Sequence, residues 1–111
     1  MAAVSAVNLV IHKGTYFEET FSLSAEDGLG LNLTNNTASA KLKKHSTAGI
    51  AYTFSTTLTI GDSTVKITMS PEVTATLPSG RCVYDLILTS PSGVISKVVE
   101  GTVLVEESVT V

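Results

Sequence analysis

An all-β, antiparallel sandwich of about seven strands is the fold that the sequence predicts, and three observations predict it. Apolar and polar residues alternate along nearly every segment, which is the period-two pattern of a pleated strand. Thr and Val, which suit a pleated surface, occur 16 and 13 times among 111 residues. Short turns rich in Gly, Pro, Asn and Asp separate the segments. A chain of this length has room for one domain, so we predict a single domain over residues 1–111.

The stretch from Leu77 to Thr89 is predicted to be a corner that leads into the central strand of the core. One face of this strand carries Cys82, Tyr84, Leu86 and Leu88, and the other carries Val83, Asp85, Ile87 and Thr89. Leu77, Gly80 and Tyr84 have the spacing of a tyrosine corner, in which the Tyr84 hydroxyl would donate to the backbone of residues 72–80. The alternative is that Tyr84 only fills space in the core.

Six further segments are predicted to be strands whose apolar residues point inward. These segments, with their inward residues, are 8–12 (Leu9, Ile11), 15–24 (Phe17, Phe21, Leu23), 37–44 (Ala38, Ala40, Leu42), 50–60 (Tyr52, Phe54, Leu58, Ile60), 65–69 (Val65, Ile67, Met69) and 94–105 (Val99, Val103, Val105). The last segment is long enough to need a bend, which we place at Gly101. Ser70 before Pro71 predicts at most one short helical turn over 71–76. Residues 1–6 are predicted to be a loose lead-in and 106–111 a tail.

Charge and composition argue against several classes of function. The net charge of −3 argues against nucleic-acid binding, and we interpret the local basic cluster as a solvated strand end; it comprises Lys41, Lys43, Lys44 and His45. No stretch has the roughly 18 apolar residues of a membrane span, and the first residues lack the pattern of a signal peptide. Cys82 is the single cysteine, so we expect no internal disulfide and a buried, inert thiol.

No catalytic, cofactor or metal site is predicted from the sequence. His12 and His45 lie outside any motif for nucleophilic catalysis, and acidic pairs such as Glu18–Glu19 lack the spacing of a calcium loop. We therefore expect a protein that is not an enzyme and holds no cofactor. A carbohydrate-binding module would favour exposed aromatic residues, and Tyr16 is the one aromatic residue on an outward phase.

Several stretches of the chain occur in an order and spacing shared with a known family. They are Gly14–Phe17, Phe21–Leu23, Leu33–Thr34, Thr37–Leu42, Leu77–Leu86, Ser92–Val105 and Val109–Thr110. With them the chain resembles the small immunoglobulin-like β-sandwich domains of tailed-bacteriophage virions, including N-terminal domains of baseplate and tail-fibre proteins. In such proteins the domain attaches a fibre or spike to the virion. Cys82 stands where an aromatic residue is more usual, and Lys43-Lys44 where Arg is often found.

The resemblance implies a non-enzymatic structural subunit of a phage particle, made in the host cytoplasm and located in the virion. Because no shaft or head is expected after residue 111, the subunit would stand alone in a tail, baseplate or fibre-attachment assembly. Its partners would be other virion proteins and copies of itself, and neither nucleic acid nor membrane is expected. A capsid decoration (cement) protein and a module that binds a host-surface glycan are the alternatives.

The two strands 80–89 and 94–105 are predicted to be apolar on both faces. The face that an antiparallel sheet normally leaves polar carries Val83, Ile87, Val94, Val98 and Leu104. A partner subunit would cover such a face, so we predict an assembly interface there. The alternative is that the lead-in, the 25–36 loop or the tail folds over it. A bulge near Gly101 would exchange the two faces of the last strand.

Overall fold

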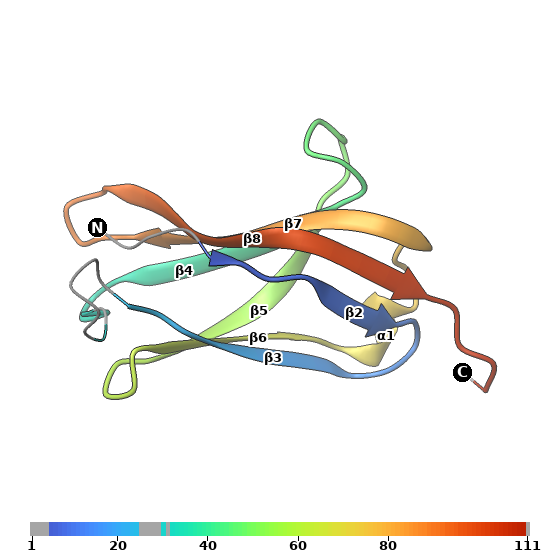
Figure 1. Ribbon diagram of the computed structural model, residues 1–111, viewed down its shortest axis with the longest axis horizontal. Coiled ribbons are helices and arrows are strands. Elements are labelled where there is room, and N and C mark those ends of the chain that lie inside the picture. Colours follow the sequence, from blue (N-terminus) through green and yellow to red (C-terminus); the bar gives the residue numbers. More distant parts are fainter. Residues whose placement is uncertain (1–4, 25–29, 31, 111) are drawn as a thin grey trace.

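One continuous mixed sheet, curled around the core, is the framework of the computed structural model, which describes residues 5–24, 30 and 32–110 (Figure 1). Its eight strands among these residues are β1 (Ser5–Ala6), β2 (Leu9–His12), β3 (Phe17–Ser22), β4 (Thr37–Lys43), β5 (Tyr52–Thr59), β6 (Thr64–Met69), β7 (Gly80–Thr89) and β8 (Ile95–Glu106). The order across the sheet is β1-β8-β7-β4-β5-β6-β3, and β2 also pairs with β8. The predicted all-β fold is confirmed.

Strand β5 joins the two layers seen in Figure 1. Its first part, Tyr52–Phe54, pairs with β4, and its second part, Ser55–Thr59, pairs with β6. Where β5 leaves β4, the hydroxyl of Thr56 donates to the carbonyl of Ala38 over 3.1 Å, so a side chain satisfies an acceptor of β4 there. Because one strand serves both layers, the sheet is a half-barrel instead of the two separate sheets that we predicted. The predicted antiparallel pairing is wrong for β1 and β2, which run parallel to β8.

The core lies between the two layers and is built from the predicted inward residues. Buried side chains from seven strands include Leu9, Ile11, Phe17, Phe21, Ala40, Leu42, Phe54, Val65, Ile67, Met69, Cys82, Tyr84, Leu86, Leu88, Val99, Val103 and Val105. The Phe54 ring lies between Phe17 and Tyr84, with ring centroids 5.9 and 6.4 Å away. Ile60 is an exception, because β5 ends at Thr59 and Ile60 begins a turn, where it is 52% exposed.

The predicted helical turn is present as α1 (Pro71–Thr74). Ser70 caps it, since its hydroxyl accepts from the amide of Val73 over 3.3 Å. Thr74 connects the turn to the β2–β3 connection: its buried hydroxyl accepts from the Gly14 amide over 3.1 Å and donates to the Thr15 carbonyl over 2.8 Å. Leu77 follows and enters the core.

Strand β8 contains a β-bulge at Val98, three residues before Gly101, where we predicted a bend. Leu86 of β7 is paired with Val99, whereas the next residue, Ile87, is paired with Lys97. Val98 is thus the additional residue, and both Val98 and Val99 are buried. The prediction that Val98 belongs to the outer face is therefore wrong: the bulge turns its side chain into the core.

The hydroxyl of Tyr84 does not bond to the corner at residues 72–80, so the predicted tyrosine corner is wrong. It donates instead to the carbonyl of Val7, between β1 and β2, over 2.6 Å. Tyr84 is paired with Gly101 of β8, and Gly101 has no side chain to separate the β8 backbone from Val7. The corner carbonyl of Pro78 accepts a long contact of 3.7 Å from the Cys82 thiol.

The predicted loose lead-in is wrong for its last two residues. Ser5 and Ala6 pair with Val99 and Glu100 of β8, and the amide of Val7 donates to the Glu100 carbonyl over 2.9 Å. Residues 1–4 lie outside the described residues. The chain therefore enters the fold along β8 before it reaches β2.

The predicted tail is partly attached to the body of the protein. The hydroxyl of Ser108 donates to the Lys13 carbonyl over 2.7 Å, and the Ser79 hydroxyl donates to the Glu107 carboxylate over 2.6 Å. The Ser79 bond and the Lys13 ammonium, 3.2 Å away, lower the pKa of Glu107 below its ordinary value. Residue 111 lies outside the described residues.

Candidate functional site

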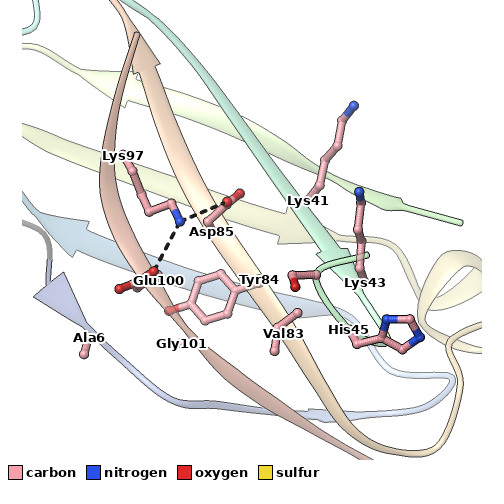
Figure 2. Close-up of a pocket in the computed structure, with 11 residues that line it drawn as sticks. Ala6, Lys41, Lys43, His45, Val83, Tyr84, Asp85, Lys97, Glu100 and Gly101 are labelled. Atoms are coloured by element: carbon pink, nitrogen blue, oxygen red, sulfur yellow. Dashed lines mark hydrogen bonds and ion pairs between the residues drawn. The ribbon is translucent and has the colours of Figure 1, made fainter. Parts of the chain in front are cut away.

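A groove of about 710 Å³ lies on the outer face of β4, β7 and β8, next to the loop that follows β4. Figure 2 shows the side chains that line it. They are Lys41, Lys43, His45, Ser46, Val83, Tyr84, Asp85, Lys97 and Glu100, with Ala6 and Gly101. We call this feature the β4–β8 groove. In sequence it was visible only as a basic cluster and as the outer phase of two strands.

The strand registers explain why these side chains meet. Ala40 and Leu42 of β4 and Tyr84 of β7 are in the core. Their neighbours along each strand therefore point to the opposite, outer face. Two rows then cross the outer face. One row is Lys41, Asp85 and Glu100, and the next is Lys43, Val83 and Thr102.

The charges in the groove are divided unequally between its two sides. On the β7–β8 side, the Lys97 ammonium lies 3.3 Å from the Glu100 carboxylate and 3.8 Å from that of Asp85 (Figure 2). On the β4 side, Lys41 and Lys43 have no ion pair within 4 Å among the described residues. The groove therefore has an acidic side, on which one ammonium group lies beside two carboxylates, and a positive side.

An apolar strip continues from the groove along β8. Val10 of β2 and Leu104 of β8 are register partners and are 49% and 42% exposed. On β7, Arg81 is the register partner of Leu104. Val83, two residues after Arg81, is half-buried on the same face. We call Val10, Val83 and Leu104 the apolar strip. Val10 was not predicted to belong to this face, although the inward phase of Leu9 and Ile11 implies that its side chain points outward.

The structure brings together only part of the predicted assembly face. Val83 and Ile87 are half-buried on the outer face of β7, and Leu104 is exposed on β8. Val94 is 58% exposed but lies in the turn before β8, at one end of the hairpin. Val98 is in the core, as described above. The suggestion that the 25–36 loop covers this face falls partly on residues 25–29 and 31, which lie outside the described residues.

Two of the titratable groups with shifted pKa values, Cys82 and Tyr84, point inward, and two others, Tyr16 and Glu107, are exposed away from the groove. Burial raises the pKa of the Cys82 thiol, and the charge of Lys44 partly opposes this. Burial, together with the carboxylate of Glu19, raises the pKa of Tyr84 to about 12. A raised pKa keeps a thiol protonated and hence a weak nucleophile. Neither group faces the groove with its reactive atom, since the Cys82 thiol contacts Pro78 and the Tyr84 hydroxyl contacts Val7.

The histidines are in exposed polar contacts. The Nδ1 atom of His12 lies 3.7 Å from the Glu106 carboxylate, and Nδ1 of His45 lies 3.1 Å from the Thr47 hydroxyl. Within residues 5–24, 30 and 32–110, no group of three His, Cys, Asp or Glu side chains is arranged to hold a metal ion. Tyr16 is 58% exposed, and its hydroxyl donates to the Glu18 carboxylate. The charges of the β4–β8 groove and the apolar strip beside it are suited to ionic and apolar contacts with another molecule.

Comparisons with known proteins leave the family open. The chain matches no protein-family model, and a search of curated proteins finds no significant match. No helix in the described part of the chain is long and apolar enough to cross a membrane.

Proposed function

We propose that this protein is a non-enzymatic structural subunit of a bacteriophage particle and that it acts through protein–protein contacts. The sequence stretches that share their order and spacing with phage virion domains support a location in a phage particle. The strand order supports the immunoglobulin-like connectivity that this resemblance implies. If β3, β6 and β5 are strands B, E and D, and β4, β7 and β8 are strands C, F and G, both layers have the order of that fold.

The apolar strip is the observation that carries the proposal. The outer face of an antiparallel sheet is normally polar, as Ser39 and Lys41 are on β4. On β2 and β8, however, Val10 and Leu104 form an exposed pair, with Val83 beside them. A partner that covers the strip would remove apolar surface from water, worth about 25 cal/mol for each Å². A binding surface of this kind suits assembly with neighbouring subunits in a tail, baseplate or fibre attachment.

The test places charges on the strip and follows the protein into particles. Val83→Lys and Leu104→Lys are substitutions of outward side chains, so the double variant should fold with a stability close to that of the wild type. It should be absent from purified particles of the phage that encodes the protein, as measured by quantitative mass spectrometry. A matched double variant, Ser55→Lys and Thr57→Lys, places the same charges on the exposed face of β5 and should enter particles normally.

Circular dichroism and urea unfolding of both double variants show whether the fold is kept. A folded strip variant that enters particles at the wild-type level would refute the proposal. Separating heads from tails before the measurement locates the subunit, because a capsid decoration protein would be recovered with heads. Recovery of the wild-type protein in neither fraction would also refute the proposal.

A further inference from the structure

Lys41 and Lys43 form a pair of cations with a fixed spacing. They are two positions apart on β4 and point to the same face, so their attachment points are about 7 Å apart. Figure 2 shows both side chains extending from β4 toward the same side of the view. Neither has an ion pair among the described residues, whereas Lys97 is engaged with both carboxylates of the groove. This positive pair is unusual for the chain, whose net charge is −3.

The spacing of the lysines matches that of an extended peptide. In an extended segment, residues i and i+2 point the same way and are also about 7 Å apart. A segment with acidic residues at i and i+2 can therefore place one carboxylate on each ammonium group. Exposed ion pairs contribute little on their own, so such a segment also needs apolar contact. Val83, the register partner of Lys43, provides it at the floor of the groove, and the apolar strip continues from there.

The other charges in the groove select a protein segment over a nucleic acid. A nucleic-acid backbone carries a negative charge at every nucleotide and needs a continuous basic path. Asp85 and Glu100 line the same groove and would repel the phosphates that follow the first two. A short acidic segment needs only the two lysines and can avoid the acidic side.

From these observations we infer that the β4–β8 groove binds an extended acidic segment of a partner protein, with carboxylates two residues apart on Lys41 and Lys43 and an apolar side chain against Val83. The inference rests on the proposed function, because it names the chemistry of a partner for the same outer face.

The probe is the peptide acetyl-Glu-Val-Glu-Val-Glu-amide, added to the full-length ¹⁵N-labelled protein. Amide shifts should move on β4, β7 and β8 around the groove. Binding should weaken between 50 and 500 mM salt, since exposed charges are screened. Lys41→Gln and Lys43→Gln should each reduce the affinity about twofold to fivefold. The matched control is Lys66→Gln, a half-buried lysine on the outer face of β6, which should leave the affinity unchanged.

Besides an absence of binding, three results would overturn the inference. The first is equal binding of acetyl-Gln-Val-Gln-Val-Gln-amide, which has the same shape without charge. The second is an equal loss of affinity in Lys43→Gln and Lys66→Gln. The third is tighter binding of a short single-stranded oligonucleotide at the same residues.

The peptide titration and the particle assay fail independently. If the peptide does not bind while the strip variant is still excluded from particles, the inference falls and the proposed function stands. If the peptide binds as expected while the strip variant enters particles normally, the groove remains a peptide site and the assembly role falls.

Discussion

Gly101→Ala is expected to be among the most destabilising single substitutions in this protein. A Cβ atom at Gly101 would lie 2.1 Å from the Val7 carbonyl oxygen and 2.8 Å from its carbon, well inside the ordinary contact distance. Both atoms are backbone, so the β1–β2 connection must move outward by more than about 1 Å. The shift would strain two hydrogen bonds of Val7, from the Tyr84 hydroxyl and to the Glu100 carbonyl. With about 1 kcal/mol for each of the two bonds and 1–3 kcal/mol for overpacking, the expected loss is about 3–5 kcal/mol.

Urea unfolding measures this loss, and amide hydrogen exchange locates it. In Gly101→Ala the amide of Val7 should lose protection before those of β7. The control is Gly61→Ala, at which a Cβ meets no atom within 4 Å and the backbone has no left-handed conformation. That substitution should be neutral or stabilise slightly, because alanine reduces the entropy of the unfolded chain. A Gly101→Ala variant within about 0.5 kcal/mol of the Gly61→Ala variant would refute the reasoning.

Three further predictions concern buried polar groups. Tyr84→Phe should cost about 1–3 kcal/mol at neutral pH, because it leaves the Val7 carbonyl without its donor. The folded-state pKa of Tyr84 is raised from 10.0 to about 12, so this contribution is present below pH 10 and lost as pH rises toward 12. Urea midpoints of wild type and variant should therefore converge across that range. Cys82 should react with a thiol reagent only as fast as the protein opens, and stoichiometric labelling of the native protein within seconds would contradict its burial. Thr74→Val should lower the free energy of unfolding by a similar amount, about 1–3 kcal/mol, as measured by urea unfolding. Thr76→Val, at an exposed hydroxyl, should change it little.

Side-chain alternation was sufficient to predict most of the core. Every predicted inward residue of β6 and β7 is buried, because these strands are regular and each has one face against the other layer. Local capping chemistry was also sufficient for α1, since Pro71 directly follows the cap Ser70 and the amide that Ser70 caps belongs to Val73, three residues on. Such signals depend on neighbours along the chain and can be recognised without knowing the fold.

The errors arose where distant segments decide the structure. The partner of the Tyr84 hydroxyl, Val7, is 77 residues away, and its position depends on the parallel pairing of β1 with β8. No local pattern specifies that pairing. The two-layer role of β5 was missed for the same reason, since a strand that changes partners at Ser55 has the same alternation as one that does not.

The bulge at Val98 has the largest consequence for the candidate site. Lys97 and Val99 are two residues apart, so a regular strand would place both on one face, and Val99 is in the core. The additional residue turns Lys97 outward, opposite Ile87, where it reaches the carboxylates of Asp85 and Glu100.

This placement also determines the charge of the opposite side of the groove. Without Lys97 on the outer face, the nearest cations to Asp85 and Glu100 would be those of β4, since Lys41 shares their row across the sheet. Lys41 would then be drawn into an internal ion pair. With Lys97 in place, both acidic groups already have a partner and Lys41 and Lys43 stay available. One irregular residue in β8 thus keeps a lysine out of the core and leaves Lys41 and Lys43 without an ion pair among the described residues.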